Sequence, residues 1–173
     1  RTTAISQGSA RIFENIGLWS LLKRSAQPIL KILVSEGVSE KNLKFDHINV
    51  KEGPLGFIIN NKDIKRRLLD EIVKSKFITF YENTKLEGIN NEDLNKSFLK
   101  TSNGDIGYKL FVGADGRFSQ TRFTANIKYF FHDYKQKAFV FNISHENPHR
   151  GVALERFFPT GPMALLPIKN KKI

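Results

Sequence analysis

The chain contains the stretch Leu110-Phe111-Val112-Gly113-Ala114-Asp115-Gly116-Arg117-Phe118-Ser119-Gln120-Thr121-Arg122, in which an apolar strand runs into a glycine-flanked turn and then a helix start. Glycines allow the backbone to lie close to a bulky anionic ligand, and Asp115 offers a carboxylate that can accept hydrogen bonds. Ser119 can cap a helix whose amino end favours phosphate. From the spacing alone, an ordinary strand-to-helix turn is the slightly better interpretation.

Helices and strands alternate on both sides of this stretch. Apolar residues at helical spacing, with Ser6 and Asn60 or Asn61 as caps, predict helices over residues 7–15, 18–23, 61–75 and 119–125. Strands are predicted at 29–35, 44–51, 77–81, 85–89, 95–101, 105–113, 137–144, 152–158 and 163–168, with Asn103-Gly104 as a tight hairpin turn. This order predicts a mixed fold, α/β or α+β, of the kind found in enzymes rather than a helix bundle or a β-sandwich.

The composition excludes several classes of site. The 173 residues are 40% hydrophobic, include 15 Phe and contain no Cys. The chain can therefore bury a sizeable core, whereas disulfides, thiolate metal sites, Cys nucleophiles and iron–sulfur clusters are excluded. No apolar run approaches the roughly 18 residues that span a bilayer. Because the sequence starts without Met and stops where a new strand could begin, we expect an internal fragment of a longer protein.

The charge of the chain is strongly positive. It carries 28 Lys plus Arg against 17 Asp plus Glu, a formal net charge of +11. Such a charge can attract nucleic acid or anionic lipid, and a basic single-stranded nucleic-acid-binding module with base-stacking Phe residues is one alternative. The basic residues are scattered, however, and a run such as 62–67 is more typical of a solvated helix face. Most Phe residues lie in apolar strands such as 138–141, which favours a core role.

The segment His145-Glu146-Asn147-Pro148-His149 matches the zinc-protease pattern H-E-x-x-H. That chemistry needs one helical face to present both imidazoles, and Pro148 disfavours a helix at this point. No third ligand is evident, since the other histidines are His47 and His132. A turn between two strands is therefore the better interpretation, and a zinc hydrolase is the third hypothesis.

The stretch 110–122 closely resembles the DG motif of flavin-dependent aromatic hydroxylases of the p-hydroxybenzoate hydroxylase type. Three further segments, 1–6, 56–64 and 148–167, resemble the ring hydroxylases of ubiquinone biosynthesis, which are one branch of that family. They occur in the expected order, and together the matches span nearly the whole chain. The combination is specific, although each segment alone is modest support.

The resemblance implies part of an FAD/NAD(P)-binding-type fold that is interleaved with a β-sheet substrate domain. Residues 1–27 and 59–125 would belong to the FAD-binding domain, and 28–58 and 126–173 to the substrate domain. No G-x-G-x-x-G fingerprint occurs in the chain, and the family's later GD segment is also missing. We therefore expect this chain alone to bind FAD weakly or not at all.

The resemblance also implies a set of site residues. The positions that match FAD-binding residues of the family are Arg1, Asn61, Gly113, Asp115, Gly116 and Arg122. Arg1 would contact the adenosine and pyrophosphate side of FAD, and Asn61 the ribityl or phosphate portion, although Asn61 could simply cap a helix. Asp115 would help to organise FAD, and Arg122 would secure the turn.

The substrate side of the resemblance rests on the last hairpin. Arg156, Phe158 and Pro162 match residues that line the cavity near the isoalloxazine and the substrate. Arg156 could equally be a surface residue paired with Glu155 or another acid. We expect the turn at Asp115 to lie close to Arg1 and Asn61 around one flavin nucleotide, with this hairpin over the reacting ring.

The function implied by the resemblance is hydroxylation of the aromatic ring of a polyprenylated phenol in ubiquinone biosynthesis. NAD(P)H would reduce FAD, O2 would form a flavin C4a-hydroperoxide, and no Asp or His general base would be obligatory. The implied partners are an anionic membrane surface and other ubiquinone-biosynthesis proteins, with no nucleic acid. The implied location is cytoplasmic, at the periphery of the inner membrane.

Overall fold

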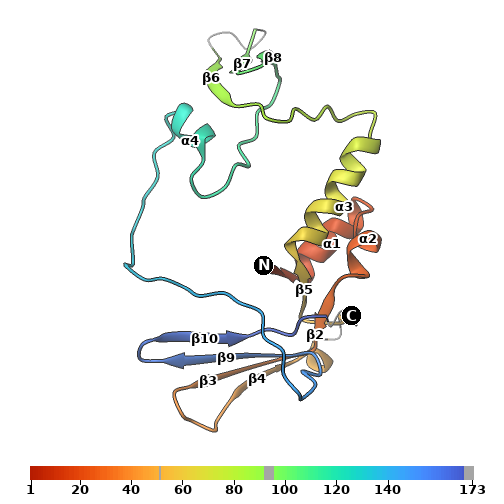
Figure 1. Ribbon diagram of the computed structural model, residues 1–173, viewed down its shortest axis with the longest axis vertical. Coiled ribbons are helices and arrows are strands. Elements are labelled where there is room, and N and C mark those ends of the chain that lie inside the picture. The colour runs from red at the N-terminus through yellow and green to blue at the C-terminus, as the bar shows by residue number, and fades with distance from the viewer. Residues whose placement is uncertain (51, 92–95, 170–173) are drawn as a thin grey trace. The chain divides into compact units, whose positions relative to one another are not determined.

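The computed structural model describes residues 1–50, 52–91 and 96–169. The chain divides into two compact units, and each is described by itself (Figure 1). The first unit contains residues 1–78 and 139–173, and the second contains residues 79–138.

A three-stranded antiparallel sheet begins the first unit. Its central strand β5 (Gly56–Asn60) lies between β1 (Thr2–Ser6) and β2 (Gln27–Ile29). A Cβ atom at Gly56 would lie 2.8 Å from the carbonyl oxygen of Ile5. Glycine at this position therefore allows β1 to approach β5 closely.

Helices α1 (Gln7–Asn15), α2 (Trp19–Lys23) and α3 (Asn61–Lys74) belong to the same unit. The Oγ atom of Ser6 accepts a hydrogen bond from the Ser9 backbone N–H, and Asn60 caps α3 in the same manner through Lys62 N–H. In the described part of the chain, none of the helices is both long and apolar enough to cross a bilayer.

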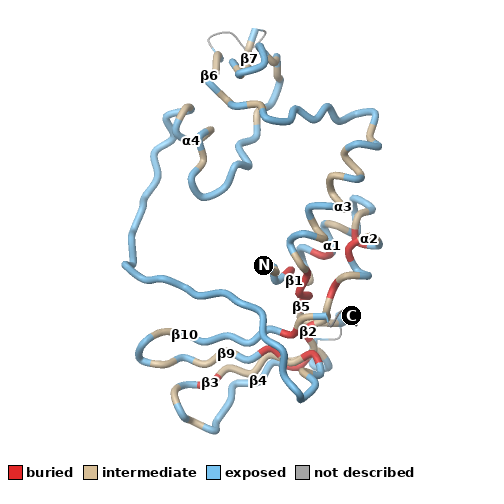
Figure 2. Tube along the Cα trace, viewed as in Figure 1, coloured by how far each residue is buried: buried red, intermediate tan, exposed pale blue. Residues whose placement is uncertain are grey.

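One core cluster joins these helices to the first sheet. It contains Ile5, Ala10, Trp19, Leu22, Ala26, Phe57 and Ile59, with Phe13 and Ile64 packed against it. The rings of Trp19 and Phe57 meet edge to face, with their centroids 4.7 Å apart. Figure 2 shows buried positions on β5, α1 and α2. The apolar stripes of the helices thus cover the sheet.

The second sheet of this unit has the strand order β10-β9-β3-β4. Its strands are β3 (Lys31–Glu36), β4 (Leu43–Asp46), β9 (Val152–Phe158) and β10 (Gly161–Leu165), and the 3-10 helix His47–Asn49 follows β4. β3 and β9 pair in parallel, whereas the outer pairs are antiparallel. A second core cluster of Ile29, Ile58 and Ala153 joins the two sheets.

The second unit contains a small antiparallel sheet and one short helix. The sheet has the order β6 (Leu86–Asn90), β7 (Phe98–Thr101) and β8 (Gly104–Gly107), and the helix is α4 (Gln120–Thr124). Gly104 has a φ of +109°, as the tight turn between β7 and β8 requires. The predicted hairpin is therefore confirmed, but its two turn residues are Ser102 and Asn103, because Gly104 already belongs to β8 and pairs with Thr101.

The mixed α/β fold is confirmed, and so are the predicted helices, with small shifts at their ends. The predicted strand 152–158 agrees with β9 at both ends. Four other strands are confirmed with changed ends: 29–35 becomes β2 and β3, 85–89 becomes β6, 95–101 becomes β7, and 163–168 becomes β10. Asn95 lies outside the described residues.

Two predicted strands, 77–81 and 137–144, are wrong, because neither segment has regular structure. Phe77 is 98% exposed, and Phe139 and Phe141 are 87% and 75% exposed. A strand needs a hydrogen-bonded neighbour, and these segments have none in the described part of the chain. The strand predicted at 105–113 ends early, at Gly107 in β8, and that predicted at 44–51 ends at Asp46. Lys51 and residues 170–173 lie outside the described residues.

The core around Trp19 can be tested by substitution. Ile59 is 1% exposed in this core, so Ile59→Ala leaves a cavity and should lower the free energy of unfolding by about 2–5 kcal/mol. Urea unfolding followed by the fluorescence of Trp19, the chain's only Trp, measures this loss. Ile12→Ala is the matched control, because Ile12 is 63% exposed and should change stability little. Equal losses in both variants would contradict the described core.

Candidate functional site

The turn at Asp115 is organised by its own carboxylate. One carboxylate oxygen of Asp115 accepts a hydrogen bond from the Ser119 hydroxyl, and the other accepts one from the Thr121 backbone N–H at 2.9 Å. The Oγ atom of Ser119 also accepts the Arg122 backbone N–H and so caps α4. The Ser119 hydrogen bond, followed by that of Thr121, lowers the pKa of Asp115 to about 2. Asp115 is therefore ionised at neutral pH and holds the turn in shape.

Gly113 and Gly116, the two glycines of this turn, have different surroundings. A Cβ atom at Gly113 would lie 2.7 Å from Cγ2 of Thr121, so Gly113 permits close packing against α4. Gly116 has a φ of +86°, and among the described residues other than Gly116 and its two chain neighbours, no atom lies within 4 Å of the position that its Cβ would take. The backbone at Gly116 is therefore open to a ligand.

The side chain of Arg122 stabilises the turn through contacts with Arg117 and Tyr129. Its Nη2 donates a hydrogen bond of 2.8 Å to the carbonyl oxygen of Arg117, and its guanidinium lies 4.1 Å from the ring centroid of Tyr129. The Nε of Arg122 is buried and has no hydrogen-bond partner in the described part of the chain. The guanidinium thus retains an unused donor.

Arg1 and Asn61 lie together at the edge of the first sheet. The Asn61 backbone N–H donates to the carbonyl oxygen of Arg1 at 3.0 Å, and the Thr3 hydroxyl donates to Oδ1 of Asn61 at 2.6 Å. Asn60, not Asn61, caps α3. The side-chain amide of Asn61 is therefore not needed for capping, and the side chain of Arg1 is exposed beside it.

Arg156 and Phe158 line a hollow on one face of the second sheet. The hollow has a volume of about 300 Å³, and its other lining residues are Leu33, Ser35, Asn42, Leu154, Glu155, Met163 and Leu165. The Nε–H of Arg156 donates to the Ser35 hydroxyl at 3.0 Å. The interaction that the structure describes for Arg156 is thus with Ser35 rather than with Glu155. Pro162 pairs with Phe157 in the hairpin and does not line this hollow.

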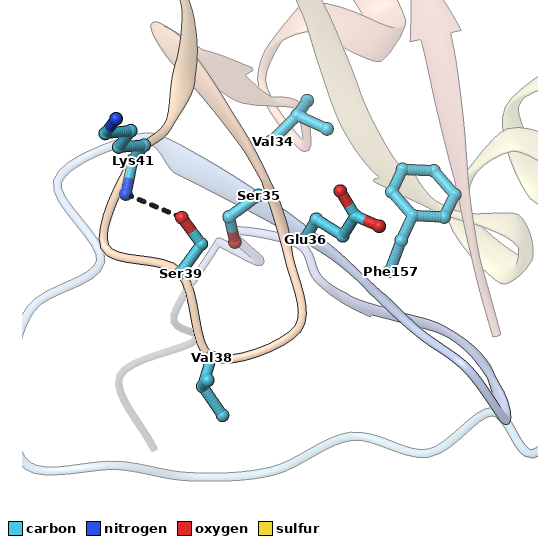
Figure 3. Close-up of a pocket in the computed structure, with 7 residues that line it drawn as sticks. All are labelled: Val34, Ser35, Glu36, Val38, Ser39, Lys41 and Phe157. Atoms are coloured by element: carbon cyan, nitrogen blue, oxygen red, sulfur yellow. Dashed lines mark hydrogen bonds between the residues drawn. The ribbon is translucent and has the colours of Figure 1, made fainter.

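A second, more open hollow is formed by β3, the turn after it and Phe157 (Figure 3). Its lining residues are Val34, Ser35, Glu36, Val38, Ser39, Lys41 and Phe157. Apart from Ser35 these are not shared with the hollow at Arg156, and none was predicted as a site residue. Ser35 was missed as well, because one serine at the end of an apolar strand gives no signal until its neighbour across the sheet is known.

The segment 145–149 forms no helix, so the geometry of a zinc protease does not arise. The Nδ1 of His149 accepts the Gly151 backbone N–H at 3.0 Å, and Nε2 lies 3.1 Å from the carbonyl oxygen of Ile168. Among the described residues, no three or more His, Asp or Glu side chains gather as metal ligands would. His149 instead ties the turn before β9 to the segment after β10.

The predicted site residues form three local groups. Arg1 and Asn61 lie together in the first unit, Arg156 and Phe158 line one hollow of the same unit, and Gly113, Asp115, Gly116 and Arg122 share one turn of the second unit. Exposed guanidinium and amide donors and an open glycine backbone fit a phosphate-bearing nucleotide such as FAD. The residues present therefore fit the flavin cofactor that the resemblance implies.

The pKa of Asp115 gives a direct test of the turn. Since it lies below the ordinary value of 3.8, the ionised carboxylate stabilises the turn fully above that pH, and this stabilisation is lost as the pH falls through about 2. Carboxyl-carbon NMR of labelled aspartate should show a midpoint near 2 for Asp115. Ser119→Ala should raise that midpoint, and Ser119→Thr should preserve it. A wild-type midpoint unchanged by Ser119→Ala would show that the hydroxyl does not hold the carboxylate.

No family model matches the chain. The ubiquinone hydroxylase UbiL of Rhodospirillum rubrum is 34% identical over 173 residues, which cover 99% of this chain and 40% of that protein. The mitochondrial ubiquinone biosynthesis monooxygenase COQ6 of Schizosaccharomyces pombe is 30% identical, over 98% of this chain and 38% of that protein. The chain therefore spans about two fifths of the length of these relatives.

Solved structures show the same fold. PqsL of Pseudomonas aeruginosa, described as a probable FAD-dependent monooxygenase, superposes with a TM-score of 0.65 at 18% identity. The match covers 78% of this chain and 38% of PqsL, and at this identity it shows a similar fold and nothing about function. None of the relatives named above supports a nucleic-acid-binding module. The similarity to UbiL and COQ6 over nearly the whole of this chain confirms the resemblance to the ubiquinone-biosynthesis branch of the FAD-dependent aromatic-ring hydroxylases.

Proposed function

We propose that the full-length protein containing this chain is an FAD-dependent monooxygenase that hydroxylates the aromatic ring of a polyprenylated phenol in ubiquinone biosynthesis. The observation that carries this proposal is the 34% identity to the ubiquinone hydroxylase UbiL over 99% of the chain. The similarity to COQ6, a ubiquinone biosynthesis monooxygenase, also supports it. NAD(P)H and O2 are the proposed co-substrates.

Bound FAD would supply the oxygen-transfer chemistry, and the residues of this chain would hold and orient it. The guanidinium of Arg1 suits the pyrophosphate, because a planar cation with several N–H donors pairs well with phosphate oxygens. The amide of Asn61 would contact the ribityl or phosphate portion. In the turn, Asp115 keeps the backbone at Gly113 and Gly116 in the shape that lies against the nucleotide, and Arg122 secures it.

The proposed domains follow the same assignment. Residues 1–27 and 59–125 would belong to the FAD-binding domain, and residues 28–58 and 126–173 would belong to the substrate domain. The proposed boundary at 58/59 falls inside β5 (Gly56–Asn60), which pairs with β1 on one side and β2 on the other. The first sheet would thus be the structural link between the two domains.

The hollow at Arg156 is the proposed place of the aromatic ring. Its volume of about 300 Å³ is at the lower end of the range for small-molecule sites. Leu33, Leu154, Phe158 and Met163 would exclude water from the ring. The guanidinium of Arg156 would donate hydrogen bonds to an oxygen substituent of the ring.

The polyprenyl tail of such a substrate resides in the bilayer, so the protein would bind the membrane surface from the cytoplasmic side. The net charge of +11 in this chain supports attraction to anionic lipid. Other ubiquinone-biosynthesis proteins are the proposed partners there. In a liposome flotation assay, the full-length protein should float with anionic vesicles more than with neutral ones, and equal flotation would contradict this part of the proposal.

The visible spectrum of the purified full-length protein tests the cofactor. A yellow protein with flavin absorption is expected, whereas the 173-residue chain alone should retain little or no FAD. A colourless full-length protein that cannot be reconstituted with FAD would remove the proposal.

Substitution of Arg156 tests the substrate site. In the full-length protein, Arg156→Ala should lower kcat/KM for a polyprenylated phenol about 10- to 100-fold, because a charged hydrogen bond contributes about 1.5–3 kcal/mol. The variant should still retain FAD. Lys100→Ala, at an exposed position of β7, is the control and should retain activity. Equal activity of the two variants would exclude Arg156 from the substrate site.

A further inference from the structure

Ser35 is a buried polar residue whose partner is 121 positions away in the chain. It is 8% exposed and lies near the end of β3, where the parallel register pairs its Cα with that of Arg156 in β9. Paired residues of neighbouring strands project their side chains to the same face of a sheet. The hydroxyl of Ser35 accordingly meets the guanidinium of Arg156, with Oγ 3.0 Å from Nε.

This contact restrains the guanidinium without neutralising it. Among the described residues, no carboxylate forms an ion pair with Arg156 within 4.0 Å, so its positive charge is not compensated by a neighbouring carboxylate. A guanidinium has five N–H donors in a fixed plane, and Ser35 engages the one at Nε. The four N–H donors at Nη1 and Nη2 remain for a ligand.

The lining of the hollow and the flexibility of arginine explain why this hydrogen bond would affect ligand binding. Arg156 lines the hollow together with the apolar side chains of Leu154, Met163 and Leu165. Asn42 and Glu155 also line it, but the hydrogen bond that the structure describes for Arg156 is with Ser35. A free arginine side chain retains several rotamers, and fixing it at the moment of binding costs affinity. A hydrogen bond already present at Nε removes part of that cost.

We infer that Ser35 is a positioning residue, which holds Arg156 so that its Nη groups point toward an oxygen substituent of the aromatic substrate. The inference rests on the proposed function, because it assigns to the hollow at Arg156 the ring of a phenol. Ser35 itself need not touch the substrate. Its part is to set the orientation of the guanidinium before the substrate arrives.

The test compares variants of Ser35 in the full-length protein. Ser35→Ala should weaken binding of ortho-prenylphenol, measured by calorimetry, and should lower kcat/KM about three- to tenfold, as expected for one neutral hydrogen bond. Ser35→Thr retains the hydroxyl and should bind like the wild type. Ser35→Val has the shape of the threonine variant but no hydroxyl, so it should behave like Ser35→Ala. If Ser35→Ala does not fold, the comparison of Ser35→Thr with Ser35→Val still tests the role of the hydroxyl.

Two comparisons separate positioning from a general structural effect. In an Arg156→Ala background, Ser35→Ala should cause no further loss, because the group that it orients is absent. Ser39→Ala is the matched control, since Ser39 lies in the turn after β3 and its hydroxyl accepts the Lys41 backbone N–H at 3.1 Å (Figure 3). That variant should bind and turn over the phenol normally.

The results distinguish this inference from the proposed function. A loss in Arg156→Ala with none in Ser35→Ala and Ser35→Val would overturn the role of Ser35 and leave the proposed function in place. Full additivity of the Ser35 and Arg156 substitutions would also overturn it. A full-length protein without flavin, or one in which Arg156→Ala changes nothing, would overturn the proposed substrate site and the inference together.

Discussion

The parallel pairing of β3 with β9 is the constraint on which the hollow at Arg156 depends. It joins residues 31–36 to residues 152–157, and the pairing sets Ser35 opposite Arg156. The pairing begins at Gly151, whose carbonyl oxygen accepts the Leu30 backbone N–H at 2.8 Å. Gly151 has a φ of +72°, and a Cβ atom there would lie 2.9 Å from Cγ of Leu30. A side chain at this position would disturb the start of the pairing and the hollow that depends on it.

The hollow at Arg156 and the turn at Asp115 are stabilised in different ways. The hollow at Arg156 depends on a sheet that joins distant segments, whereas the turn at Asp115 is held by local contacts over residues 113–122. Both oxygens of the Asp115 carboxylate are engaged within that turn. Recognition of a nucleotide there would therefore come from the backbone at Gly116 and the nearby guanidinium groups. The carboxylate acts mainly through the conformation that it maintains.

Local features of the structure could be predicted well from the sequence. The starts of α1 and α3 follow from their N-caps, Ser6 and Asn60, because a side-chain acceptor at that position is a local signal. The strands 77–81 and 137–144 were predicted wrongly because apolar alternation shows only that a segment can pair. Whether it does pair depends on a neighbour that local sequence cannot reveal. The parallel register of β3 with β9, and thus the contact of Ser35 with Arg156, could not be predicted for the same reason.

The spacing of the site residues alone slightly favoured an ordinary turn at Asp115, and the resemblance of four segments in order changed that interpretation. Similarity to UbiL over 99% of the chain supports the resemblance, and the local geometry explains how the matched residues are held. The proposed function rests on this similarity, and the contacts of each group come from the structure.

The most direct measurement is a crystal structure of the full-length protein with FAD bound. The account predicts that the backbone around Gly116, the guanidinium of Arg1 and the amide of Asn61 all contact the same flavin nucleotide, with Arg156 beside the isoalloxazine ring. A structure in which the turn at Asp115 faces bulk solvent, far from the flavin and from both Arg1 and Asn61, would contradict it.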